Sequence, residues 1–165
     1  MYIQTMRDEV TDVLERRLQM APVRDSAVRG IMNPFVVSAH AMDAFERVTG
    51  QAGLSYASYN VLRILRGQPE GHARRSIAQR LVTKNADVTR LIDGLVGRGL
   101  VRRVRSKRDG RVSLARITPK GTEFLAQLDP LLETTFVEEY RRRLSPAQWT
   151  ELSRLLEAVY EPDAA

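Results

Sequence analysis

The chain has 165 residues, the length of one typical domain, and its 26 basic and 20 acidic residues give a formal net charge of +6. Charged residues make up 28% and hydrophobic residues 43%, a composition typical of a globular protein rather than a disordered one. The absence of cysteine excludes disulfides, zinc–thiolate sites, iron–sulfur clusters and thiol-based redox sensing. No apolar run reaches the roughly 18 residues of a membrane span, and the N-terminal residues are too polar for a signal peptide. We therefore expect a cytoplasmic protein with no membrane partner.

The first third of the chain predicts three helices. Apolar residues recur at helical spacing in Tyr2–Met20, and Pro22 ends that segment. A second helix is predicted from about Asp25 to Thr49, where Pro34 either lies in the first turn or kinks a helix that begins earlier. Apolar residues on most sides of this helix predict burial on more than one face. Ser55 is the expected cap of a third helix that ends near Arg66.

Two short helices and a strand pair come next. The first helix is expected at Ser76–Leu81, and the second begins at Lys84 or Asn85 and runs to Arg98. The pattern then changes from a period of about 3.6 to a period of 2. This change predicts two strands, Leu100–Arg105 and Val112–Thr118, joined by a turn in which Asp-Gly is the hairpin signal.

The C-terminal part predicts two more helices. Thr118 is the expected cap of a long helix, with Pro119 at its first position and Pro130 as a potential kink. Ser145-Pro146 opens the last helix, and Pro162 ends it. The order of elements predicts a mainly α fold with a small β-hairpin wing. Residues 54–118 form a winged helix–turn–helix lobe, and residues 1–50 and 119–165 supply flanking dimerisation helices, because so small a lobe cannot bury them all.

The charge is concentrated in the predicted lobe. Between Arg63 and Lys120 there are sixteen basic and four acidic residues, so this segment carries +12 and the rest of the chain carries −6. Such asymmetry favours a polyanion-binding module, with a solvated arginine-rich surface as the alternative. The second short helix is slim enough for the major groove of DNA, and the arginines of the wing suit the minor groove.

Individual residues of the lobe are candidates for DNA contacts. Asn85 is suited to adenine, Arg90 to guanine or a phosphate, and Thr89 to a phosphate or a thymine methyl. The expected phosphate-binding residues at the first short helix are Arg74, Arg75 and Arg80, together with the helix-start amides. Lys84 and Ala86 belong to the same expected surface, because they adjoin the start of the second helix and Ala86 is expected to face outward.

The motifs of this lobe resemble the MarR family of transcriptional regulators over roughly Leu54 to Leu132. The resemblance rests on five strings in order: Ile77-Ala78-Gln79-Arg80-Leu81, Val88-Thr89-Arg90-Leu91-Ile92-Asp93, Arg98-Gly99-Leu100-Val101-Arg102-Arg103, Asp109-Gly110-Arg111 and Ile117-Thr118-Pro119-Lys120-Gly121. It implies a homodimer that binds a pseudo-palindromic site on double-stranded DNA. It also implies that Asp109 anchors the wing and that Arg111 enters the minor groove. Gly110 departs from the family pattern, which has arginine there, and Arg108 is the substitute cation.

The resemblance also implies an effector site, because family members often bind anionic aromatic molecules between the dimer helices and the DNA-binding lobe. By that analogy a small aromatic or phenolic effector contacts Met32, Phe35, Ala39, His40, Phe45, Tyr59 and Arg63. Ordinary dimer core is the alternative for each of these residues, and a packed core histidine is favoured for His40. His72, in a turn, is expected to be solvated.

No enzyme or cofactor motif is present. The sequence has only two histidines, so no histidine cluster can bind a metal, and it lacks a glycine-rich phosphate loop and a catalytic triad spacing. The leading interpretation is a dimeric, sequence-specific DNA-binding regulator that acts as a ligand-responsive repressor. A winged-helix protein–protein interaction module and a non-specific architectural DNA binder are the alternatives.

Overall fold

A computed structural model describes residues 13–83 and 86–161, and the chain divides into two compact units, Met1–Ala44 and Phe45–Ala165. The first unit contains a short helix at residues 13–18 and the N-terminal part of α2 (Ser26–Gln51). Glu15 joins the two, because its buried carboxylate accepts hydrogen bonds from the Val23 amide (3.1 Å) and from the Arg29 guanidinium. Most of the predicted helix Tyr2–Met20 lies outside the described residues.

The start of α2 resolves the two readings of Pro34. The helix begins at Ser26, where the Asp25 carboxylate accepts hydrogen bonds from the amides of Ala27 and Val28, so Pro34 lies inside it. The predicted burial on more than one face is wrong for the single chain. Several apolar side chains of α2 are exposed, among them Ile31, Val37 and Phe35, whose exposed fraction is 72%.

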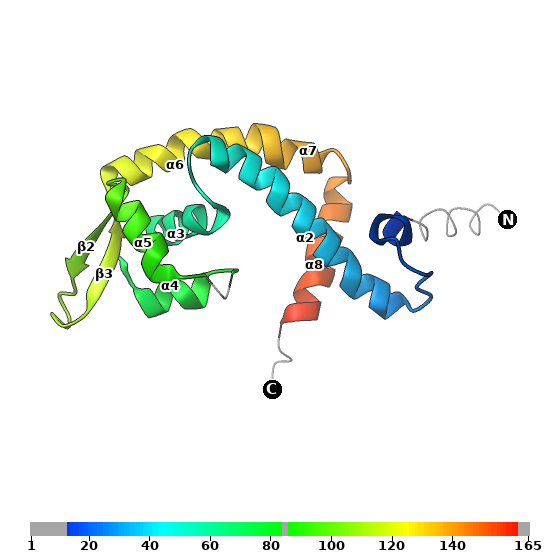
Figure 1. Cartoon of the computed structure of the whole chain (residues 1–165), viewed down its shortest axis with the longest axis horizontal. Helices are drawn as coiled ribbons and strands as arrows, with labels where there is room; N and C mark the ends of the chain where they lie inside the picture. Colours follow the sequence, from blue (N-terminus) through cyan, green and yellow to red (C-terminus); the bar gives the residue numbers. More distant parts are fainter. Residues whose placement is uncertain (1–12, 84–85, 162–165) are drawn as a thin grey trace. The chain divides into compact units, whose positions relative to one another are not determined.

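The second unit is built on a small helical lobe with a strand hairpin (Figure 1). It contains α3 (Tyr56–Arg66), α4 (Arg74–Arg80) and α5 (Val88–Gly97), followed by β2 (Val101–Arg105) and β3 (Ser113–Ile117). The capping of α3 by Ser55 is confirmed, since its hydroxyl accepts a hydrogen bond from the Ser58 amide at 3.2 Å. The mainly α architecture with a β-hairpin wing is confirmed as well.

The sheet has one strand more than the sequence predicts. The short strand β1 (His72–Ala73) pairs with β3, which is therefore the central strand of an antiparallel sheet in the order β1-β3-β2. His72 is thus half-buried in a strand rather than solvated in a turn, and its Nδ1 lies 3.1 Å from the Ser76 hydroxyl. Burial lowers the pKa of His72, and the positive charge of Arg80 lowers it further. The sequence does not predict β1, because two residues are too few to show a periodicity.

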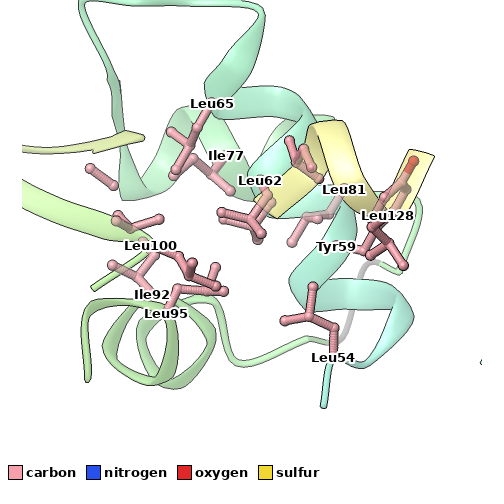
Figure 2. Close-up of a cluster of buried hydrophobic side chains, with 14 of the residues drawn as sticks. Leu54, Tyr59, Leu62, Leu65, Ile77, Leu81, Ile92, Leu95, Leu100 and Leu128 are labelled. Atoms are coloured by element: carbon pink, nitrogen blue, oxygen red, sulfur yellow. The ribbon is translucent and has the colours of Figure 1, made fainter. Parts of the chain in front are cut away.

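The hydrophobic core of the lobe lies where α3, α4, α5 and the base of the hairpin meet. Figure 2 shows the side chains of Leu62, Leu65, Ile77, Ile92 and Leu95 gathered in one cluster with Leu100. Leu62, Leu65 and Ile77 have no exposed surface, and Ile92 and Leu95 are the inward positions that helical spacing predicts for α5. This core fixes α5 against the sheet and leaves its opposite face to solvent.

The C-terminal helices follow the hairpin directly. They are α6 (Pro119–Leu132), a π-helical turn η1 (Glu133–Val137), α7 (Glu138–Arg141) and α8 (Pro146–Tyr160). The predicted cap is confirmed, because the Thr118 hydroxyl accepts a hydrogen bond from the Gly121 amide at 3.0 Å. Pro130 does not end its helix; the irregularity follows it, at the π-helical turn. Within the described ranges, no helix is long and apolar enough to cross a membrane.

Candidate nucleic-acid interface

The exposed surface of the lobe begins at α4. Arg74 and Arg75 are exposed in its first turn, which starts two residues earlier than predicted. Arg80 instead folds back on its own helix, where its guanidinium donates to the Ser76 carbonyl (3.0 Å) and hydroxyl (2.6 Å). All three arginines of α4 are exposed, but only the guanidinium of Arg80 is bound to its own helix.

Helix α5 starts later than the sequence predicts. Asp87 is its N-cap, and the Asp87 carboxylate accepts a hydrogen bond from the Arg90 amide at 3.1 Å. Thr89 and Arg90 are exposed in the first turn, so the outward orientation that the sequence predicts for them is confirmed. Ala86 precedes the helix and packs, half-buried, against the core, so its predicted outward orientation is wrong. The predicted sites Lys84 and Asn85 lie outside the described residues.

The wing is closed by backbone and side-chain hydrogen bonds together, and not by a two-residue Asp-Gly turn. The Asp109 carboxylate accepts a hydrogen bond from the Arg111 amide at 2.9 Å, and the Asp109 carbonyl accepts one from the Val112 amide at 2.9 Å. The Ser106 hydroxyl accepts from the Arg108 amide at 3.2 Å. The described glycines with positive φ do not include Gly110, so the turn does not use the left-handed conformation that the Asp-Gly signal implies. Both arginine side chains at the tip are exposed.

An ion pair joins the wing to α5. The Arg103 guanidinium of β2 pairs with the Asp93 carboxylate, although both side chains are about half exposed. A hollow of about 30 Å³ lies beside this pair, lined by Arg74, Thr89, Ile92, Arg103, Ser113 and Ala115. Predicted site residues of α4 and α5 are thus brought next to the wing. Sequence reasoning missed the pair, because periodicity does not reveal which residue of a strand faces a given helix.

Three of the residues expected to contact an effector form one cluster in the second unit. The Phe45 and Tyr59 rings meet edge to face with centroids 5.1 Å apart, and the Arg63 guanidinium donates to the Tyr59 hydroxyl at 3.0 Å. That hydroxyl donates to Asp129 of α6 at 2.9 Å, and Arg66 pairs with the same carboxylate at 2.6 Å. Burial raises the pKa of Tyr59, and the hydrogen bond to Asp129 raises it further.

The remaining effector candidates lie in the first unit. Met32 is half-buried there, while Phe35, Ala39 and His40 are exposed. The expectation that His40 is a packed core histidine is therefore wrong for the single chain. Sequence reasoning also missed Asp129 and Arg66, since the two are 63 positions apart and only the folded chain brings them together.

Comparisons with known proteins agree on one family. The model of the MarR family matches residues 54–113. A MarR transcription factor from Planctomyces limnophilus is 32% identical, with 82% of this chain and 98% of that chain covered and a TM-score of 0.61. No curated protein matches the sequence significantly.

Two further solved structures share the fold at lower identity. A mutant MarR from E. coli in complex with operator DNA is 19% identical, covers 86% of this chain and 100% of its own, and has a TM-score of 0.74. CouR from Rhodococcus jostii RHA1, bound to p-coumaroyl-CoA, is 21% identical, covers 87% of this chain and 99% of its own, and has a TM-score of 0.71.

Proposed function

This chain belongs to the MarR family of transcriptional regulators, and from that membership we propose that it is a homodimeric, ligand-responsive repressor of transcription. In this proposal it binds a pseudo-palindromic operator in double-stranded DNA, in the cytoplasm. An effector that favours a different spacing of the two lobes releases it.

The observation that carries the proposal is the exposed face formed by α4, α5 and the wing. The core of the lobe covers one side of α5, whereas Thr89 and Arg90 on its other side are open to solvent. Exposed arginines flank them at the start of α4 and at the wing tip, where Arg108 and Arg111 lie. A slim helix between two groups of cations matches a major groove bordered by phosphates, with the wing over the adjacent minor groove.

Uncovered apolar residues on the terminal helices support the homodimer. None of the residues of α8, all of which are described, is buried, and five of them are large exposed hydrophobic residues: Leu152, Leu155, Leu156, Val159 and Tyr160. Phe35 of α2 and Leu131 of α6 are exposed as well. Burying apolar area against a second copy is favourable by about 25 cal/mol per Å². Such a dimer presents two α5 helices to successive turns of the major groove, about 34–36 Å apart.

The cluster of Phe45, Tyr59 and Arg63 supports an anionic aromatic effector. It offers two aromatic rings and a guanidinium that remains about half exposed while it lies 3.7 Å from Asp129. A carboxylate or phenolate that binds Arg63 competes with Asp129 for it. Because Asp129 belongs to α6 and Arg63 to α3, this competition changes a contact between the lobe and the dimerisation helices. Met32, Phe35, Ala39 and His40 lie in the first unit, and their part in an effector site stays a prediction from the sequence. CouR, which shares the fold, binds p-coumaroyl-CoA.

Electrophoretic mobility shift with the DNA upstream of the protein's own gene tests the proposal. We expect a complex that survives excess random DNA, because specific regulators prefer their sites by about 10³-fold or more. Arg111→Ala should weaken this complex strongly while the dimer and the fold persist. Equal competition by random DNA would indicate an architectural binder, and no complex at low salt would indicate a protein–protein interaction module.

A further inference from the structure

The strand register divides the arginines of β2 between two faces of the wing. In the antiparallel pair β2–β3, Arg103 lies opposite Ala115 and Arg105 lies opposite Ser113. Successive residues of a strand point to opposite faces, so Arg103 and Arg105 share the face of Ala115. Ala115 is 4% exposed and lines a hollow together with residues of α5. This face of the wing is therefore the one turned toward α5.

Two hollows make this face concave. The larger has a volume of about 370 Å³ and is lined by Arg103, Arg105 and Arg111 together with Gly110 and Ser113. The smaller, of about 30 Å³, extends to Thr89 and Arg74. Arg103 and Ser113 line both, so the concave surface runs without interruption from the wing tip to the first turns of α5 and α4.

The charges on this surface are unequally compensated. Arg103 is paired with Asp93. Arg105 and Arg111 are exposed, and within the described part of the chain neither side chain forms an ion pair. Arg105 is the last residue of β2 and also borders a hollow on the other side of the hairpin, but its register with Ser113 assigns it to the face of Arg103. A concave surface with uncompensated guanidinium groups is a site for an anion.

We infer that Arg105 binds a phosphate of the DNA backbone on the α5-facing side of the wing. This inference rests on the proposed DNA-binding function and adds a contact that none of the sequence motifs singles out. The surface is continuous with α5, which is proposed to lie in the major groove. A guanidinium beside that helix meets the phosphate backbone that borders the groove before it meets base edges. A phosphate is therefore the expected partner of Arg105. The contact contributes affinity without sequence preference.

Arg102 is the matched control. It lies on the same strand and is also exposed, but its register partner is Arg116, so it occupies the opposite face. The side chain of Arg116 is itself bound to the Pro69 carbonyl and, at 3.1 Å, to Glu70. Replacing Arg102 or Arg105 by glutamine removes one positive charge from neighbouring positions, so any effect of net charge alone is the same in both variants.

The test measures fluorescence anisotropy of a labelled random-sequence duplex with the full-length protein across a salt series from about 50 to 200 mM. Arg105→Gln should reduce the slope of log affinity against log salt by about 0.9, which is the release of one phosphate contact. Arg102→Gln should have the same slope as the parent protein. Arg105→Lys should have a slope close to that of the parent protein, because lysine still neutralises a phosphate.

The outcomes separate this inference from the proposed function. If the parent protein shows a steep salt dependence but Arg105→Gln and Arg102→Gln have the same slope, the assignment of Arg105 is wrong and the DNA-binding function stands. If the parent protein itself binds the duplex with no salt dependence, or does not bind it, both are wrong. Far-ultraviolet circular dichroism of each variant confirms that the comparison is between folded proteins.

Discussion

The junction between α6 and the base of the wing has room for a glycine and for no larger residue. A Cβ atom at Gly121 would lie 2.2 Å from the Leu100 carbonyl oxygen and 2.8 Å from Cγ1 of Ile117. The Leu100 carbonyl cannot readily move, because it accepts a hydrogen bond from the Thr118 amide at 3.0 Å. We therefore expect Gly121→Ala to force α6 away from the lobe.

The size of the effect follows from this geometry. Overpacking a well-packed core costs about 1–3 kcal/mol, and a clash with backbone belongs at the upper end of that range. For a protein of this length, 1 kcal/mol changes Tm by about 2–4 °C. Gly121→Ala should therefore lower Tm by about 6–12 °C.

Gly94→Ala is the matched control. A Cβ at Gly94, on the exposed side of α5, would meet no heavy atom within 4 Å. Alanine is favoured over glycine in a helix by about 1 kcal/mol, so this variant should raise Tm by about 2–4 °C. Differential scanning fluorimetry at one fixed protein concentration measures both, since the Tm of a dimer depends on concentration. A Gly121→Ala protein that melts within about 2 °C of the parent would refute the argument.

Three further predictions concern stability and are read from urea unfolding midpoints. Asp129→Asn should cost about 1–3 kcal/mol, because the Arg66 guanidinium and the Tyr59 hydroxyl lose a partly buried charged partner, and an unchanged midpoint would contradict this. Asp87→Ala should cost about 1 kcal/mol by removing the cap of α5, whereas Asp87→Asn should cost much less. Burial lowers the pKa of His72, so the unfolded chain binds the proton more tightly than the folded chain does. The free energy of unfolding should therefore fall as pH decreases through about 6.5. The fall should be smaller in His72→Gln.

The sequence predicted the elements whose signals are local. Caps and periodicity identified α3, the core face of α5, the two strands of the hairpin and the start of α6 at Thr118. The sequence predicts that α5 begins at Lys84 or Asn85, whereas the structure identifies Asp87 as its cap. Local sequence ranks candidate caps poorly when several polar residues adjoin one another.

The sequence did not predict contacts between residues that are far apart along the chain. The pairing of Asp93 with Arg103 depends on strand register, and that of Asp129 with Arg66 depends on how α6 crosses α3. The strand β1 forms only because β3 offers it a partner, since two residues have no periodicity of their own. The DNA contacts proposed from the sequence stay predictions, and Arg105 joins them from the strand register.

The central claim is that two copies of this chain read a two-fold related DNA site. Selection of bound duplexes from a random-sequence library by the purified protein tests it most directly. The account predicts enrichment of an inverted repeat whose half-site centres are about 10–10.5 base pairs apart, or a multiple of that spacing, because a dimer presents one α5 helix to each half-site. Enrichment of a single asymmetric site, or of no sequence at all, would contradict it.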